Sequence, residues 1–291
     1  MENFDPLVQT GWLQEHLDEP DVRVVDIRGY VRKTDLGGGR QKAEYLPARE
    51  EYDEAHIPGA VYVDWTRDIV DPGDPVPAQV APPDRFAALM SSLSIGNGSH
   101  VVAYDHAGGQ FATRLWWALV YYGHERVSVL DGGWRKWTAE NRPTTDRVPD
   151  PAPATFIPEP QPGWRVDAEH VRSAGGEADI LILDARDWGQ YTGEIARGEG
   201  RGGHVPGAEH LHADSLFDPE SETFLPDDQL EKRLREAGVP ENKEKPVVAY
   251  CNGGVAATVP LFALHRLGYR NLSNYDGSWN EWGVREDLPV E

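Results

Sequence analysis

The sequence predicts an α/β protein with two tandem copies of one domain, each a mainly parallel β-sheet flanked by helices. Three observations predict this fold: short apolar runs that alternate with helical segments, an internal repeat of about half the 291 residues, and a proline-rich stretch between the copies. Apolar runs with many β-branched residues are typical of buried parallel strands, which need helices on both faces. Half of this chain is the size of an ordinary domain.

The first repeated block is an apolar run that ends in Asp-x-Arg, at residues 22–28 and again at residues 180–186. Each run predicts a buried strand that leads into a loop. Arg186 closes the second run, where it either binds a substrate or forms a salt bridge that fixes the loop. Arg28 stands at the same place in the first copy and favours the salt bridge, but both interpretations stay open.

Two further blocks are kept in both copies, so the fold is the simplest reason for them. His-x-Pro-Gly-Ala occurs at residues 56–60 and 204–208, and Asp-Gly-x-Trp ends at Trp134 and at Trp279. We interpret the two histidines as turn or packing residues. We interpret the two tryptophans as wedges that pack the domains rather than as substrate contacts.

The remaining block, residues 101–105, matches residues 247–251. Each copy predicts a buried strand, a Gly-containing loop and then an apolar helix, at residues 112–122 and 257–267. Strands that alternate with helices in this way indicate α/β layers around a mainly parallel sheet.

A proline-rich stretch, residues 143–163, lies between the two copies. Such a stretch continues neither a helix nor a central strand, and it is typical of a semi-rigid linker. The predicted organisation is therefore a first domain at residues 1–145, a linker at 146–163 and a second domain at 164–291.

The composition predicts a cytoplasmic protein that binds neither membranes nor nucleic acid. No run of eighteen apolar residues occurs, and the start of the chain does not resemble a signal peptide. The formal net charge is −21, which opposes binding to phosphates. The acidic, lysine-poor surface suits a high-salt cytoplasm, while an acidic protein from a GC-rich genome stays an alternative. Any anion site must then be a local cluster of arginines or backbone N–H groups.

Cys251 is the only cysteine, and it stands where the first copy has Asp105. A single cysteine forms neither an internal disulfide nor a cysteine-based zinc site. The strand before it, the Gly-rich loop after it and the helix beyond predict a nest of N–H groups at the positive end of a helix dipole. Such a nest favours the reactive thiolate.

Cysteine phosphatases and arsenate reductases use a similar nest, but they need an arginine six positions after the cysteine. Here that position is Ala257, so the arginine that clamps the oxyanion is absent. What remains is nucleophilic attack on a sulfur donor, with the persulfide held by the N–H groups of the loop.

These motifs resemble the tandem-domain rhodanese family, the thiosulfate and mercaptopyruvate sulfurtransferases, over nearly the whole chain. The segments that carry the resemblance are residues 184–186, 203–208, 250–256 and 275–279. Asp105 at the cysteine position also matches the inactive first domain of that family. The loop from Cys251 to Ala256 has the six-residue length of sulfurtransferases.

The resemblance implies two rhodanese-like domains and a ping-pong reaction at Cys251. The thiolate would take the outer sulfur of thiosulfate and release sulfite. The persulfide would then pass its sulfur to cyanide, a thiol or an acceptor protein. The resemblance implies no metal and no organic cofactor.

The sequence departs from the family at the expected substrate positions. Asn252 and Gly253 replace the basic residues of vertebrate-type thiosulfate enzymes, and Ala256 replaces a threonine of mercaptopyruvate enzymes. Gln190 stands where an arginine often follows Asp-x-Arg by four residues. The substrate-binding residues that we expect are therefore loop residues and nearby arginines: Asn252, Gly253, Gly254, Val255, Ala256, Arg186, Arg197 and Arg201.

Several functions stay open at this point. Residues 71–83 contain no counterpart of the histidine proposed for mercaptopyruvate enzymes, which favours thiosulfate as the donor. An accessible Cys251 would favour a persulfide carrier that serves another protein. A buried Cys251 or a collapsed loop would favour a non-catalytic sensor or binding module, although a single cysteine cannot close an internal disulfide.

Overall fold

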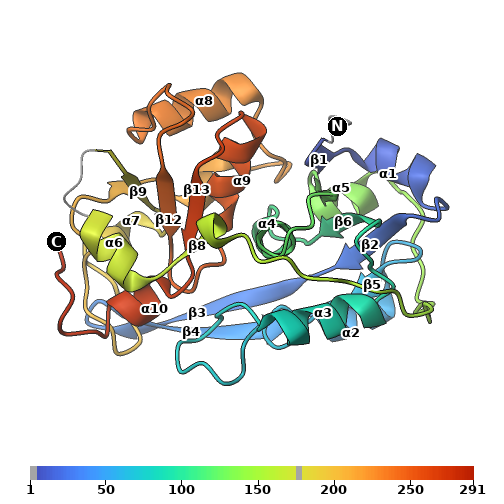
Figure 1. Ribbon diagram of the computed structural model, residues 1–291, viewed down its shortest axis with the longest axis horizontal. Coiled ribbons are helices and arrows are strands. Elements are labelled where there is room, and N and C mark those ends of the chain that lie inside the picture. Colours follow the sequence, from blue (N-terminus) through green and yellow to red (C-terminus); the bar gives the residue numbers. More distant parts are fainter. Residues whose placement is uncertain (1–4, 175–178) are drawn as a thin grey trace.

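The computed structural model describes residues 5–174 and 179–291 (Figure 1). The prediction about targeting rests partly on residues 1–4, which lie outside those ranges. Within the described ranges, none of the helices combines the length and the apolar character that crossing a membrane requires.

The first half of the chain forms a five-stranded sheet in which every neighbouring pair is parallel. The strands in spatial order are β1 (Leu7–Val8), β7 (Val127–Leu130), β6 (His100–Tyr104), β2 (Val22–Asp26) and β5 (Val61–Tyr62). The helices of this half are α1 (Thr10–His16), α2 (Arg49–Glu54), α3 (Pro83–Ser92), α4 (Gln110–Tyr121) and α5 (Gly133–Ala139).

The second half repeats this architecture, which confirms the predicted fold class. Its parallel strands in spatial order are β8 (Arg165–Val166), β13 (Leu272–Tyr275), β12 (Val247–Tyr250), β9 (Leu181–Asp184) and β11 (Glu209–His210). Its helices are α6 (Ala168–Ala174), α7 (Trp188–Tyr191), α8 (Asp227–Glu236), α9 (Thr258–Arg266) and α10 (Ser278–Trp282), with 3₁₀ turns η1 (Pro162–Trp164) and η2 (Ala213–Leu216). Each strand of the first sheet has a counterpart at the same place in the second.

The two halves meet along helices α4 and α9, which Figure 1 shows between the two sheets. These are the two apolar helices that the sequence predicts, and each of their ends is shifted by one or two residues. The hydroxyls of Thr113 and Thr258 lie 2.9 Å apart, and the rings of Trp116 and Phe262 meet edge to face at 5.0 Å. Helix α4 is buried along residues 111–120, because one face covers its own sheet and the other covers the second half.

A β-hairpin that the sequence analysis did not predict joins the two halves. Strands β3 (Gly29–Gly37) and β4 (Arg40–Pro47) are antiparallel, and β4 also pairs in parallel with β10 (Ala196–Arg197) of the second half. Figure 1 shows β3 and β4 as long arrows that run beneath both lobes. The resulting three-stranded sheet carries residues of the first half to the side of the second half where Cys251 lies.

The proline-rich linker is packed rather than free. Its Phe156 is buried, and its backbone N–H groups at Ala154 and Glu159 donate to the carbonyls of Ser91 and Tyr122 at 2.9 Å. No helix or strand occupies the linker before η1, in keeping with its prolines. The exact domain boundaries remain a prediction.

Candidate functional site

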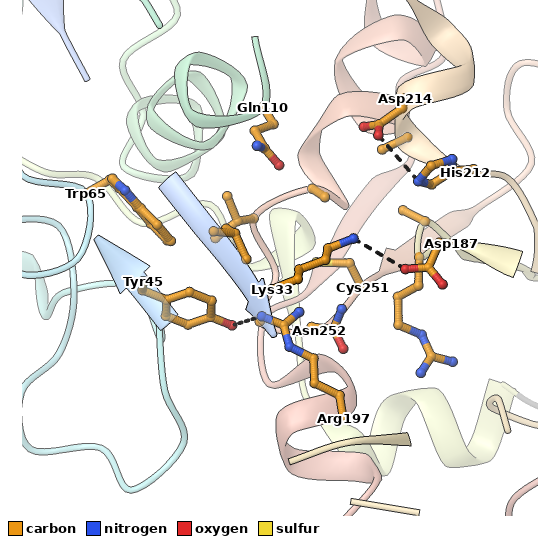
Figure 2. A pocket seen from close by; sticks show the side chains of 17 residues that line it. Lys33, Tyr45, Trp65, Gln110, Asp187, Arg197, His212, Asp214, Cys251 and Asn252 are labelled. Carbon is orange, nitrogen blue, oxygen red and sulfur yellow. Dashed lines mark hydrogen bonds and ion pairs between the residues drawn. The ribbon is translucent and has the colours of Figure 1, made fainter. Parts of the chain in front are cut away.

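A cavity of about 180 Å³ lies between the two halves, with Cys251 in its wall (Figure 2). Its lining from the first half is Val31, Lys33, Tyr45, Trp65 and Gln110. Its lining from the second half is Ala185, Arg186, Asp187, Arg197, His212, Ala213, Asp214, Cys251, Asn252, Gly253, Val255 and Ala256. A cavity of this volume suits a small molecule of a few heavy atoms, because drug-sized ligands need several hundred Å³.

The backbone holds Cys251 firmly at the carboxyl end of β12. Its N–H donates to the Ser278 hydroxyl at 3.1 Å, and its carbonyl accepts from the Trp279 N–H at 3.0 Å. The residue is only 4% exposed, yet it lines the cavity. The sulfur is therefore reached through the cavity, not from open solvent.

The loop after Cys251 presents backbone N–H groups that no described residue uses. Within residues 5–174 and 179–291, the N–H groups of residues 252–257 meet no hydrogen-bond acceptor. Turn bonds begin only at the Thr258 N–H, which donates to Val255. Free N–H groups that converge on one point at the start of a helix form an anion-binding nest.

The first half shows what such a nest binds, because its loop contains an anion of its own. The Asp105 carboxylate stands in the place of the Cys251 side chain and accepts four backbone N–H bonds at 2.8–3.0 Å. The donors belong to Ala107, Gly109, Phe111 and Ala112. The corresponding nest in the second half has a one-atom sulfur instead, so it has room for a further anionic atom or group.

Gly254 shapes this loop and does not line the cavity. It adopts φ +70°, and its carbonyl accepts from the Arg114 guanidinium at 3.1 Å and from the Asn274 amide at 2.9 Å. A Cβ at this position would lie 2.8 Å from Asp276. Gly254 therefore serves as the anchor of the loop, while its four neighbours, Asn252, Gly253, Val255 and Ala256, face the cavity.

Arg186 forms the salt bridge that its counterpart Arg28 indicated. Its guanidinium donates to Asp184 at 2.6 Å and to the Gly203 carbonyl at 2.7 Å, and it lies 4.2 Å from the Trp279 ring centre. Burial alone lowers the pKa of Arg186, but the Asp184 carboxylate raises it above the ordinary value, so the charge is kept. Although the residue touches the cavity, these bonds hold the guanidinium in place.

Of the other two predicted arginines, Arg197 lines the cavity and Arg201 does not. Arg201 donates to four carbonyls of the C-terminal segment, at Trp282, Gly283, Arg285 and Leu288, and lies outside the cavity lining. These bonds make Arg201 a structural residue, so its predicted role in substrate binding is wrong. Arg197 does line the cavity, and within the described residues no carboxylate pairs with it. Its guanidinium contacts the Tyr45 hydroxyl at 3.4 Å and lies 5.5 Å from that ring's centre.

Gln190 takes part in a chain of amides that reaches the cysteine loop. Its carbonyl oxygen accepts from the Asn252 side chain at 2.8 Å, and its amide nitrogen donates to Gln41 of the hairpin at 3.2 Å. Gln190 is 1% exposed, so it fixes Asn252 and offers no free donor to a substrate. The oxygen of the Asn252 amide is buried with no partner among the described residues.

The sequence analysis missed lining residues from both halves: Ala185, Asp187, His212, Ala213 and Asp214 in the second, and every lining residue of the first. Figure 2 shows Lys33, Tyr45, Trp65 and Gln110 around the cavity, opposite the cysteine loop. The rings of Tyr45 and Trp65 lie 5.1 Å apart and form an aromatic wall. No repeat signal could reveal these residues, because the hairpin that carries three of the lining side chains, including Lys33, occurs in one half only.

The histidines and tryptophans that both copies keep make structural contacts and are not substrate contacts, as predicted. His56 and His204 stack on Tyr52 and Tyr191 at 4.0 and 3.8 Å, and the Nδ1–H of each histidine donates to the carbonyl of the same tyrosine. Trp134 and Trp279 stack on the buried guanidinium groups of Arg28 and Arg186, at 4.4 and 4.2 Å. None of the four lines the cavity.

Comparison with known proteins places these features in a family context. A model of the rhodanese-like domain matches residues 9–140 and 167–284. A sulfur carrier protein, TtuD of Thermus thermophilus, is 33% identical over 98% of this chain and 95% of its own length. The 3-mercaptopyruvate sulfurtransferase of Escherichia coli K12 is 32% identical over 98% and 97%. The crystal structure of SseA from Escherichia coli, a 3-mercaptopyruvate sulfotransferase by its description, superposes with a TM-score of 0.81 at 30% identity, covering 94% of this chain and 98% of SseA.

Proposed function

Because the chain belongs to the rhodanese-like sulfurtransferases, we propose that Cys251 is its catalytic thiol and that thiosulfate is its sulfur donor. The Cys251 thiolate attacks the outer sulfur of thiosulfate, a new S–S bond forms, and the bond to the sulfonate sulfur breaks as sulfite leaves. A nucleophilic acceptor, cyanide or a thiolate, then attacks the outer persulfide sulfur. The electron pair of the broken S–S bond returns to Cys251 as thiolate.

The observation that carries this proposal is the unfilled N–H nest around Cys251. The same nest in the first half holds the Asp105 carboxylate with four N–H bonds. A persulfide anion at Cys251 puts its outer sulfur, and its charge, where those carboxylate oxygens lie. Preorganised donors at the place where charge develops stabilise both the persulfide and the transition state that leads to it.

Arg197 is the residue that we assign to the sulfonate end of the donor. It lines the cavity, it is free of carboxylates among the described residues, and Tyr45 supports its guanidinium. A guanidinium offers two parallel donors, which suits the oxygens of a sulfonate. Asn252, Gly253, Val255 and Ala256 form the other wall against the donor.

Thiosulfate is favoured over 3-mercaptopyruvate by the segment that lies beside the site. Residues 71–83 contain no histidine, and the side chain of Gln79 in that segment donates to the Asp276 carbonyl at 2.9 Å. The mercaptopyruvate reaction produces pyruvate enolate, which needs a proton from an acid; the histidine that lines the cavity, His212, comes from another segment and lies 3.6 Å from Asp214. The thiosulfate reaction releases sulfite and needs no such acid.

A small acceptor is favoured over an acceptor protein by the depth of the sulfur. Cys251 is 4% exposed in a cavity of about 180 Å³, which admits cyanide or a small thiol. The burial of Cys251 would favour a non-catalytic module if the loop had collapsed. The loop is open, however, because its N–H groups bond to no described residue and Cys251 lines the cavity. A carrier role, as in the name of TtuD, would require an acceptor segment thin enough to enter.

A paired assay tests the proposal. Sulfite release from thiosulfate and pyruvate release from 3-mercaptopyruvate are measured with the wild-type protein and with Cys251→Ser, in low and high salt. We expect sulfite release to dominate in the wild type, loss of both activities in the variant, and one added sulfur atom on Cys251 by mass spectrometry. Normal rates in Cys251→Ser would refute the catalytic role, and dominant pyruvate release would refute the choice of donor.

A further inference from the structure

The hairpin brings a lysine of the first half into the cavity. Lys33 lies on β3, and its ammonium reaches Asp187 of the second half at 3.4 Å (Figure 2). The side chains are 47% and 27% exposed, so this pair is solvated and weak. Lys33 is therefore held at the cavity without being committed to a strong partner.

The register of the three-stranded sheet places Lys33 and Arg197 on one face. Lys33 stands opposite Ala43 on β4, and Arg197 stands opposite Gln41 on the same strand. Directly paired residues share a face, and residues two apart on a strand share it as well. The face that carries Lys33, Tyr45 and Arg197 is the one that lines the cavity.

The charges around the cavity leave few cations for an anionic donor. The chain has a formal net charge of −21, and Arg186 is already neutralised by Asp184. Asp187 and Asp214 add negative charge to the lining. The remaining lysine and arginine side chains that line the cavity are Lys33 and Arg197.

We propose that Lys33 is a substrate-binding residue, whose ammonium binds an oxygen of the sulfur donor beside Arg197 and favours a dianion over a monoanion. The proposal rests on the function proposed above and names a determinant of its donor specificity. Thiosulfate carries two negative charges, whereas 3-mercaptopyruvate has a single carboxylate. A second cation near the donor therefore stabilises bound thiosulfate more than bound 3-mercaptopyruvate.

The Asp187 carboxylate competes with the sulfur donor for the Lys33 ammonium and so weakens donor binding. One of its carboxylate oxygens accepts from the Gln190 N–H at 3.1 Å and caps α7, while the other faces Lys33. A donor oxygen that binds Lys33 must displace this second oxygen. Asp187→Asn keeps an oxygen for the cap and removes the competing charge, so it should strengthen donor binding.

The experiment compares Lys33→Gln with Lys42→Gln. Lys42 lies on the same hairpin, is paired with Glu44, and occupies the opposite face because it is adjacent to Ala43. Both variants change the net charge equally, but only Lys33→Gln removes a cation from the cavity. We expect Lys33→Gln to raise the KM for thiosulfate roughly threefold to tenfold and that for 3-mercaptopyruvate less, and Asp187→Asn to lower the thiosulfate KM.

A binding measurement separates this proposal from the proposed function. Sulfate, an unreactive dianion, is titrated into Cys251→Ala with and without Lys33→Gln or Lys42→Gln. Weaker sulfate binding with Lys33→Gln alone supports the role of Lys33 even if the wild type fails to form a persulfide, a result that would refute only the proposed function. Equal sulfate affinity in the two lysine variants, or an equal rise in KM for both donors, would overturn the role of Lys33.

Discussion

Replacing Asp105 by asparagine measures directly how strongly this type of loop binds an anion. Asp105 is 1% exposed, and its two oxygens accept N–H bonds from Ala107 and Gly109 on one side and from Phe111 and Ala112 on the other. An asparagine has nearly the same shape but only one oxygen. Whichever way its amide is oriented, one pair of N–H groups then faces an NH₂ group.

The expected loss follows from the two bonds that vanish. A hydrogen bond to a charged group contributes roughly 1.5–3 kcal/mol, so two of them give a decrease of about 3–6 kcal/mol in the free energy of unfolding. A single domain is stable by only about 5–15 kcal/mol, so this change is large. It should appear as a marked shift of the urea midpoint with an unchanged slope.

Asp18→Asn is the control, because Asp18 is exposed and forms no hydrogen bond or ion pair with the described residues that an amide would lose. We expect that variant to unfold with a midpoint close to the wild type. If Asp105→Asn is destabilised by less than about 1 kcal/mol, or no more than Asp18→Asn, the loop does not stabilise an anion strongly. The corresponding loop would then not be expected to stabilise a persulfide at Cys251.

Three other variants test the site and the interface. Arg114→Met breaks the buried 2.7 Å ion pair with Asp276 between the halves, and should lower the free energy of unfolding by roughly 3–5 kcal/mol in denaturant titrations. Gln190→Ala frees the Asn252 side chain from its 2.8 Å bond, and should reduce sulfite release more than stability, which separate assays of both would show. Burial lowers the pKa of His265 to about 4, so the folded state binds fewer protons than the unfolded state below pH about 6.5. Stability should therefore fall from pH about 6.5 down to about 4, and His265→Gln should flatten that part of the stability curve; an unchanged curve would contradict the buried neutral state.

The sequence predicted the parts of the molecule that depend on local or repeated patterns. The strand, Gly-rich loop and helix around Cys251 are local, and Asp105 at the same place in the first copy pointed to the difference between the two nests. Arg28 likewise indicated the buried salt bridge of Arg186, since both copies keep it. Patterns of this kind are set by neighbouring residues, so they can be interpreted without a structure.

The missed parts depend on contacts between distant segments. The hairpin of residues 29–47 has polar, largely exposed side chains, so it lacks the regular alternation that marks a half-buried strand. Its glycines at residues 37–39 all adopt positive φ and turn the chain there. Arg197 and Arg201 look alike in sequence, and only the carbonyls of the C-terminal segment decide that Arg201 turns away.

The sheet formed by β3, β4 and β10 also determines what either half could achieve alone. Residues 164–291, produced as a separate polypeptide, would retain the thiol and the N–H groups of its loop. They would lose the rings of Tyr45 and Trp65 and the ammonium group of Lys33, which the first half supplies. Such a fragment would expose the apolar surface of α9 that α4 now covers. The first half therefore supplies one wall of the cavity in which we propose that Cys251 reacts, so the second half alone should not form a complete site.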